Sequence, residues 1–455
     1  MIVLRKFRNI IAVLVCKILI FVSKLLGKKG SSGPGSIAMK ISPTILKDLS
    51  SQLKGPVIMV CGTNGKTTTN NLIYSLFKSK GKRVVCNNVG ANMLPGVACA
   101  FIDSASIFAN LKADCASIEC DEASLRRVVP HVKPDMVVVT NLFRDQLDRY
   151  GEIEMTLGLL DEALCQAKDT LLIINGDDPV SARLSLGRKC VFYGVDENCN
   201  LPESDSKEGR FCLGCGSELS YNYNHYSQLG DYFCKNCGFK RPELDYAAKN
   251  VNLSNGLKFE ICGKKQIHLS LNYRGFYNIY NILASLCAYA ESGESTYDIE
   301  KVFDEYKPQI GRMESFDIMG KQVVLNLAKN PAGFNQAIQT VMSDEKKKDV
   351  LIAVNDMPSD GQDVSWLWDV DFEKLKSLNV GKIYLSGTRK NDLAIRLKYV
   401  GFENFIVCET DKENLADIIS KSEGICYMLV NYTVLFDVQT SLKNLSGQAE
   451  EAQGK

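Results

Sequence analysis

Short apolar runs alternate with amphipathic segments along the first half of the chain. Residues 57–60 predict a buried strand, residues 62–66 a tight loop and residues 67–80 a helix. Further strands are predicted at residues 83–86, 136–140, 171–174 and 190–192, with helical patterns between several of them. Strands that alternate with helices favour a mostly parallel α/β sheet.

A second α/β pattern follows Arg312, so the chain is predicted to contain more than one domain. Its strands are predicted at residues 323–327, 350–354, 382–385, 405–407 and 426–430. Between about residues 205 and 245, short aromatic, Cys- and Gly-bearing pieces indicate an insert, and a helical pattern at residues 278–290 resumes the first domain. A chain of 455 residues exceeds what one core usually organises. We expect an N-terminal segment 1–45, a central domain 46–311 and a C-terminal domain 312–455.

The N-terminal segment combines apolar and basic residues. Its first 29 residues carry seven basic side chains and no acidic one. The apolar run 10–22 contains Lys17 and is too short to span a bilayer, which needs about 20 apolar residues. On a helix, Lys6, Lys17, Lys24 and Lys28 fall within a narrow arc opposite an apolar face. The pattern fits a helix lying on an anionic membrane surface, and equally one packed on the protein's own core or on a partner.

The segment 31–36, Ser-Ser-Gly-Pro-Gly-Ser, predicts a turn-rich linker after this helix. A cleavable signal is not expected, because no small-residue cleavage site closely follows the first apolar stretch. The 17 cysteines are odd in number and mostly stand singly in apolar runs, as at Cys86, Cys99, Cys287 and Cys426. This pattern indicates reduced, buried thiols and a cytoplasmic protein.

Composition narrows the function classes. With 45% hydrophobic and 24% charged residues, the chain is typical of globular proteins. A net charge of +1 provides no overall field that would attract nucleic acid, so anion binding must come from local sites.

A glycine-rich loop after the first predicted strand is the strongest candidate for such a site. It contains Gly62, Thr63, Asn64, Gly65, Lys66, Thr67, Thr68 and Thr69. Glycines let backbone N–H groups approach phosphates, Lys66 reaches the terminal phosphates of ATP, and Thr67 can hold Mg²⁺. The general P-loop pattern also has glycine at position 60, where this chain has Val60, which points to a sub-family. A purely structural turn is the alternative.

The insert carries two C-x₂-C pairs. Cys212 and Cys215 are separated by 18 residues from Cys234 and Cys237. This spacing lets four thiolates surround one Zn²⁺. Because no histidine or carboxylate replaces a cysteine, the zinc is expected to be structural. A nucleic-acid-binding ribbon is the alternative, but no basic cluster with interleaved aromatic residues accompanies the pairs.

The loop resembles that of the Mur ligases and folylpolyglutamate synthases, and further similar segments follow in order over about 250 residues. Glu119, within 118–122, stands where that family has a magnesium-binding glutamate. Residues 140–151 are similar to the family's Thr-Asn…Asp-His-Leu-Asp…His-Gly segment. The other similar segments are 175–178, 275–281 and 311–314. The resemblance implies Mg²⁺ ligation by Thr67 and Glu119. It also implies ATP-binding roles for Asn175, Asn278, Asn281 and Arg312.

Departures from that family are informative as well. Gln146 replaces a family histidine, which puts metal coordination there in doubt, and Leu160 stands where many Mur ligases have a carbamylated lysine. The loop begins only about 60 residues into the chain, which leaves no room for the domain that grips the UDP of soluble Mur substrates. A substrate carried on lipid would explain this loss and give the basic helix a purpose.

The Cys₄ insert, the short N-terminal part and the segments 329–335 and 355–369 are together similar to the MurT family, the Mur-ligase-like subunits of lipid II isoglutaminyl synthases. The resemblance implies ATP-dependent amidation of the α-carboxyl of D-glutamate in the lipid II stem peptide to D-isoglutamine, through an acyl phosphate. It places the protein at the inner face of the cell membrane. Lys66 and Glu119 are the candidate catalytic residues.

Ammonia is expected to come from another chain. The three histidines, His131, His225 and His268, have no recognisable nucleophile setting. The resemblance implies a heterodimer with a GatD-like glutaminase subunit, whose cysteine–histidine pair would be supported by Asp356. A capping or turn aspartate is the alternative reading of Asp356.

Two other functions stay open at this point. The chain could be a ligase of the Mur or folylpolyglutamate type that adds an amino acid, or a non-catalytic zinc-ribbon scaffold switched by ATP. Contacts to the stem peptide are also undecided. Asn88, Gly90, Ala91 and Asn92 are candidates because they form a polar, glycine-bearing loop after a strand.

Overall fold

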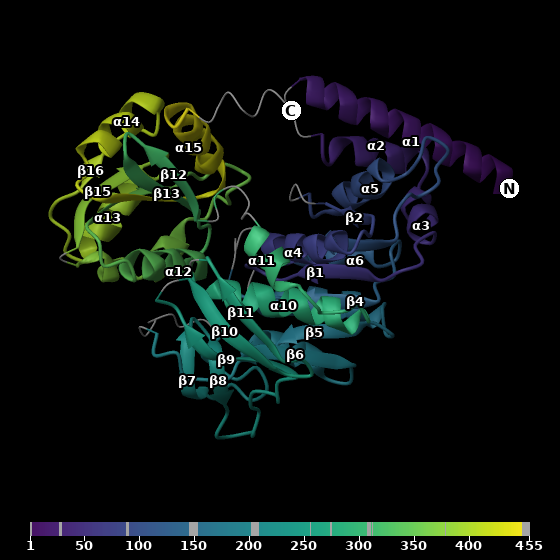
Figure 1. Ribbon diagram of the computed structural model, residues 1–455, viewed down its shortest axis with the longest axis horizontal. Helices are drawn as coiled ribbons and strands as arrows, with labels where there is room; N and C mark the ends of the chain where they lie inside the picture. The colour runs from purple at the N-terminus through teal and green to yellow at the C-terminus, as the bar shows by residue number, and fades with distance from the viewer. Residues whose placement is uncertain are drawn as a thin grey trace.

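The computed structural model describes residues 2–26, 30–87, 91–144, 153–201, 209–254, 256–273, 275–306, 311, 313–377 and 379–447. Two α/β bodies stand out in Figure 1, each built around its own sheet, with the later one at the left of the view. The expected mostly parallel α/β architecture is therefore confirmed.

The larger sheet has nine strands in the order β11-β10-β9-β6-β5-β4-β1-β3-β2. Its parallel part consists of β1 (Val57–Cys61), β2 (Val84–Cys86), β3 (Cys115–Glu119), β4 (Met136–Val139), β5 (Leu171–Asn175) and β6 (Cys190–Val195). Strand β9 (Tyr246–Asn252) extends it in parallel beside β6, and β10 (Leu257–Gly263) and β11 (Ile267–Leu271) follow with antiparallel pairing between β9 and β10 and between β10 and β11. The apolar runs of β1, β3 and β4 are buried throughout, as expected for strands covered on both faces.

Side chains of β1 alternate between two cores because successive strand residues point to opposite faces. Ile58 and Val60 join the core under α4 (Lys66–Ser79), α10 (Tyr277–Glu291) and α11 (Glu300–Glu305). Val57, Met59 and Cys61 join the opposite core. That core is covered by α2 (Gly33–Ile41), α3 (Ile45–Ser50), α5 (Leu94–Asp103), α6 (Glu122–Val128), α8 (Ile153–Cys165) and α9 (Pro179–Ala182), followed by the 3₁₀ turn η1 (Arg183–Ser185).

The N-terminal helix α1 (Ile2–Leu25) packs on α2 and α5, and Figure 1 shows it along the outer edge of the molecule. The predicted linker at 31–36 is wrong, because α2 already begins at Gly33. Proline is tolerated in a first helical turn, and a side chain on Gly35 would meet the carbonyl oxygen of Pro95 at 2.0 Å. The glycine thus serves close helix packing. No helix in the described ranges has both the length and the apolar character required to cross a bilayer.

The second sheet has six strands in the order β12-β13-β17-β14-β15-β16. They are β12 (Glu314–Ile318), β13 (Lys321–Leu327), β14 (Lys348–Ala353), β15 (Val380–Ser386), β16 (Ile406–Val407) and β17 (Ile425–Val430). One core lies with α12 (Pro331–Met342), α13 (Lys390–Tyr399) and the 3₁₀ turns η2 (Ser365–Asp369) and η3 (Phe372–Leu375). The other lies with α14 (Lys412–Lys421) and α15 (Tyr432–Leu445).

The insert contains a separate hairpin of β7 (Ser220–Tyr226) and β8 (Leu229–Phe233). This hairpin, the central strand β3, β9 to β11 and the antiparallel strand β12 were not predicted as strands; in β3, Ser117 and Glu119 interrupt the apolar run. The pattern of β10 mixes buried and exposed residues, and that of β12 alternates them in part, so neither forms the continuous apolar run that marked the parallel strands.

Candidate functional site

The glycine-rich loop between β1 and α4 is held by the segment that follows β4. The Thr63 N–H donates to the Asn141 carbonyl oxygen at 2.8 Å, and the Asn64 N–H donates to Asn141 Oδ1 at 2.9 Å. The Thr140 hydroxyl donates to the Asn64 carbonyl oxygen at 2.7 Å. Because β1 and β4 are parallel neighbours, these segments leave the sheet at the same edge.

Both loop glycines are required by close contacts. Gly62 has φ +120°, and a Cβ there would lie 2.3 Å from Thr140 Oγ1. Gly65 has φ +85°, and a Cβ there would lie 2.2 Å from Asn281 Oδ1. The loop leads directly into the N-terminus of α4, where free backbone N–H groups and the helix dipole favour an anion such as phosphate.

Lys66, the first residue of α4, is buried and paired. Its Nζ donates to Glu122 Oε1 at 2.8 Å, to the Thr63 carbonyl oxygen at 3.2 Å and to the carbonyl oxygen of Gly62. Burial acts to lower the pKa of Lys66, but the carboxylate of Glu122 outweighs it, and the pKa is raised above its ordinary value. Lys66 therefore stays charged. Sequence reasoning missed Glu122, although it is an acid directly after a strand-end glutamate motif.

Glu119 ends β3 with one oxygen unused. Asn87 anchors its backbone through two hydrogen bonds of 2.8 Å, and Asn92 Nδ2 donates to Glu119 Oε1 at 3.1 Å. The other oxygen, Oε2, is buried and has no hydrogen-bond partner among the described residues. A buried acceptor of this kind calls for a donor or a cation. Carboxylate and hydroxyl oxygens are the ligands that Mg²⁺ prefers, so Glu119 and Thr67 fit such an ion.

A pocket lies between this loop, α10 and the second α/β body. Its lining includes Asn64, Gly65, Thr68, Thr140, Asn141, Tyr226, Tyr277, Tyr280, Asn281, Asn326, Leu327, Ala328, Lys329, Ala332, Gly333, Gln336 and Ala337. Asn330 connects the two bodies, since its Nδ2 donates to Asn64 Oδ1 at 3.2 Å while its Oδ1 accepts from the Gly333 N–H at 2.8 Å and caps α12. The sequence identified 329–335 as a motif but did not predict this contact.

The remaining predicted residues occupy different places. Asn175 is fully buried and donates from Nδ2 to the Thr140 carbonyl oxygen at 3.1 Å, so it supports the loop from behind. Asn278 Oδ1 accepts from Asn281 Nδ2 at 3.0 Å on the first turn of α10. Asn92 and Ala91 lie beside Glu119 and Asn87, whose Nδ2 donates to the Ala91 carbonyl oxygen. Arg312, Gln146, Asn88 and Gly90 lie outside the described residues.

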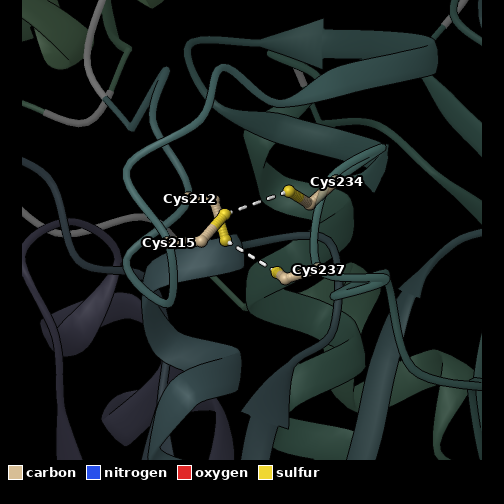
Figure 2. A group of neighbouring side chains, drawn as sticks. All are labelled: Cys212, Cys215, Cys234 and Cys237. Atoms are coloured by element: carbon tan, nitrogen blue, oxygen red, sulfur yellow. Dashed lines mark hydrogen bonds between the residues drawn. The ribbon is translucent and has the colours of Figure 1, made fainter.

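The four cysteines of the insert come together, as Figure 2 shows. Their sulfur atoms all lie within 4.8 Å of one another, with 3.5 Å for Cys212–Cys237 and for Cys215–Cys234. Tetrahedral zinc thiolate sites place sulfurs about 3.8 Å apart, given Zn–S bonds of about 2.3 Å. Each knuckle closes through a glycine N–H, from Gly216 to the Cys212 carbonyl and from Gly238 to the Cys234 carbonyl. This donor set fits a structural Zn²⁺.

The insert also contacts the central domain through hydrogen bonds and an ion pair. Gln228 Nε2 donates to the Leu142 carbonyl oxygen at 2.7 Å and to Asp178 Oδ1 at 2.9 Å. Arg241 pairs with the fully buried Asp177 at 3.1 Å, and burial raises the pKa of Asp177 to about 6. Tyr226 of β7 lines the pocket. The insert thus contributes to the site from one side.

Asp356 follows β14 at the surface of the second body. Its Oδ1 accepts from the Thr388 hydroxyl at 2.7 Å, and its Oδ2 pairs with Arg389 Nε at 3.0 Å. The Thr388 hydrogen bond, aided by the charge of Arg389, holds the pKa of Asp356 below its usual range. The neighbouring Asp360 is buried and accepts from the Thr433 N–H at 2.8 Å. Asp360 also accepts from the Met357 N–H at 3.3 Å and so stabilises this turn.

Comparisons with known proteins agree with this geometry. The Mur ligase middle domain model matches residues 60–236, and the MurT ligase C-terminal model matches residues 327–435. The chain is 37% identical over 415 residues, 91% of this chain and 93% of the relative, to the lipid II isoglutaminyl synthase (glutamine-hydrolyzing) subunit MurT of Staphylococcus aureus (strain COL). Identity to the corresponding subunit of Streptococcus pneumoniae (strain ATCC BAA-255 / R6) is 33% over 93% of this chain and 94% of the relative.

Solved structures share the fold. A pseudomurein peptide ligase type C from Methanothermus fervidus superposes with a TM-score of 0.67 at 22% identity, over 86% of this chain and 79% of that one. The MurF ligase from Thermotoga maritima, solved in complex with ADP, gives a TM-score of 0.64 at 17% identity, over 91% and 85%.

Proposed function

The chain belongs to the MurT family of Mur-ligase-type proteins, and from this premise we propose that it is the ATP-using subunit of an amide-forming ligase acting on lipid II. One observation carries the proposal. A glycine loop suited to phosphate, the charged Lys66 and the half-satisfied carboxylate of Glu119 lie at one edge of the sheet. Relatives of the chain are named as ligases, so its class is that of ATP-dependent carbon–nitrogen ligases.

The first step is activation of a carboxylate. An oxygen of the substrate carboxylate attacks the γ-phosphorus of ATP, the bond to the β,γ-bridging oxygen breaks, and ADP leaves. Backbone N–H groups of the loop and the ammonium of Lys66 bind the phosphates and stabilise the charge that develops there. Glu119 and Thr67 would hold Mg²⁺, which supplies further charge neutralisation on the phosphate oxygens.

Lys66 needs a partner that keeps it charged in a buried position. The carboxylate of Glu122, at 2.8 Å, supplies the opposite charge. Together with the Gly62 and Thr63 carbonyl oxygens it orients the ammonium group. Glu122 is thus a positioning residue for Lys66.

The second step forms the amide. Ammonia attacks the carbonyl carbon of the acyl phosphate, the carbon–oxygen bond to phosphate breaks, and phosphate departs while the ammonium nitrogen loses a proton. The carboxylate is the α-carboxyl of D-glutamate in the stem peptide of lipid II, and the product is D-isoglutamine. Support for this substrate comes from the family, whose curated members carry the name lipid II isoglutaminyl synthase subunit.

Ammonia is delivered by a separate glutaminase subunit in a heterodimer, and Asp356 orients that partner's cysteine–histidine pair. Three features support this role. The carboxylate is ionised, is held by Thr388 and Arg389, and is partly exposed at the surface of the second body, where another chain can reach it.

Reconstitution tests the proposal. The chain, its glutaminase partner, ATP, glutamine and lipid II should yield ADP, phosphate and a product whose mass reflects replacement of one hydroxyl by an amino group. Ammonium chloride in place of glutamine should support the same product without the partner. A mass increase by an amino acid residue would instead support a peptide ligase, and phosphate release independent of lipid II would support an ATP-switched scaffold.

A further inference from the structure

Helix α1 has two apolar faces, and only one of them is covered by other parts of the described structure. Ala12, Val13, Cys16 and Ile20 are buried in the core beneath the helix. A second set, alternately three and four residues apart, points outward: Leu4, Phe7, Ile11, Leu14, Ile18, Phe21 and Leu25. We call this set the α1 stripe. Its members are between 37% and 71% exposed, and it runs about 32 Å at about 1.5 Å per residue.

Polar anchors fix α1 in this orientation. Arg5 pairs with Asp48, and Asn9 Nδ2 donates to the same carboxylate at 2.8 Å. Further along, Lys17 Nζ donates to the Asp103 carbonyl oxygen at 2.9 Å. Because these contacts lie near both ends of the buried face, they hold the α1 stripe facing away from the body. Figure 1 shows α1 along the outer edge of the molecule.

The charged side chains of α1 itself are all basic. Helix α1 contains no acidic residue. At about 100° per residue, Lys6, Lys17 and Lys24 lie along one border of the stripe and Arg8 along the other. A continuous apolar strip bordered by cations is the arrangement of helices that lie in the plane of an anionic membrane surface.

We propose that the α1 stripe docks on the surface of an anionic lipid bilayer, with its apolar side chains at the headgroup boundary and Lys6 and Lys24 among the headgroups. A second copy of the chain is a poorer occupant, because two stripes packed together would bring their borders of like charge into contact. At a bilayer, long basic side chains extend to the headgroups and gain from the negative surface potential.

Docking would also fix how far the phosphate-binding loop lies from the membrane surface. Helix α1 packs on α5, which begins at Leu94, two residues after the Asn92 that contacts Glu119. Helix α1 and the layer formed by α2 and α5 therefore lie between the membrane surface and this edge of the sheet. This part rests on the proposed function, in which the substrate is anchored in lipid.

Vesicle co-sedimentation of the full-length chain tests the docking. Vesicles of equal parts phosphatidylglycerol and phosphatidylethanolamine should retain the protein at least tenfold better than phosphatidylcholine vesicles. Phe7→Glu/Phe21→Glu should reduce retention by at least about tenfold, and Lys6→Gln/Lys24→Gln by about tenfold at low salt. The matched control is Met155→Glu/Ile395→Glu, which alters side chains that are 61% and 59% exposed elsewhere and should leave retention unchanged.

Several results would overturn the docking. These are equal retention on both vesicle types, retention that survives the stripe substitutions, or light scattering that shows a dimer dispersed by Phe7→Glu/Phe21→Glu. Loss of retention when the glutaminase subunit binds would also overturn it and assign the stripe to that partner. Amidation of lipid II in detergent micelles separates the two proposals. If amidation proceeds in micelles while the chain does not bind vesicles, the docking proposal is wrong and the proposed function stands.

Discussion

The two sheets of this protein both carry candidate functional loops at the carboxyl ends of their strands, but one of these sites is enclosed and the other is open. Lys66 and Glu119 are buried, and the charged Lys66 forms an ion pair with Glu122 of the same domain. Asp356 is partly exposed, and the described residues contact its carboxylate through the Thr388 hydroxyl and the Arg389 guanidinium. The enclosed site brings together groups suited to phosphate chemistry, whereas the open one offers a carboxylate held by a hydroxyl and an arginine. A buried charge demands an internal partner, while an exposed one leaves room for another protein.

Removing the lysine should disrupt the enclosed site most strongly. We expect Lys66→Ala to lower amidation by about a thousandfold, because charge on the transferring phosphoryl group is no longer stabilised. It should also lower the free energy of unfolding by about 3 kcal/mol, since Glu122 is left buried without its partner. Phosphate release and denaturant unfolding measure the two effects.

A second substitution separates these effects. Lys66→Ala/Glu122→Gln should regain most of the lost stability but none of the activity. If the double variant were as unstable as Lys66→Ala, the buried ion pair would not be the source of the loss.

The open site should respond only when glutamine is the nitrogen source. We expect Asp356→Asn to reduce glutamine-driven amidation at least about a hundredfold, by analogy with loss of an orienting carboxylate in a triad. Activity with ammonium chloride should be unchanged. The matched control is Asp392→Asn, which removes another carboxylate beside Arg389 and should leave both activities intact. Equal loss with both nitrogen sources would place Asp356 in the phosphate chemistry or the fold instead.

The insert should affect the enclosed site indirectly. Cys234→Ser should abolish stoichiometric zinc, measured by atomic emission, and weaken ATP binding about tenfold, because Tyr226 and Gln228 lose their support beside the pocket. Cys165→Ser, an exposed cysteine outside the cluster, is the control and should retain both. Full ATP affinity without zinc would show that the insert does not shape the pocket.

The contact between the two bodies should contribute least. Asn330→Asp keeps the acceptor that caps α12 but removes the amide that donates to Asn64. We expect KM for ATP to rise about threefold with little change in stability, a loss typical of one hydrogen bond. Asp keeps the acceptor for a second hydrogen bond, from Asn64 Nδ2 at 3.4 Å, so an unchanged KM would mean that this bond alone maintains the contact.

The sequence predicted the parallel strands that have unbroken apolar runs, but it missed β3 and β9, which also pair in parallel, together with the antiparallel strands β10 to β12. Continuous apolar runs such as β1 and β4 are distinctive because both faces are covered. β10 and β12 have mixed faces and were missed. The segment around Gly35 was interpreted as a linker, because glycine and proline suit a turn and a close helix contact equally. The turn propensity of glycine and proline does not distinguish these two uses, because the outcome depends on what packs against the residue.

Local spacing alone determined the glycine loop, the two cysteine pairs and the basic face of α1, because each depends on residues a few positions apart. Only the tertiary structure decided which groups meet across the chain. Lys66 pairs with a glutamate 56 positions away, and Asn64 meets an asparagine 266 positions away. It also decided which apolar face of α1 is buried and which is left outward. Such contacts follow from the path of the chain through two packed sheets, and spacing along the sequence does not encode that path locally.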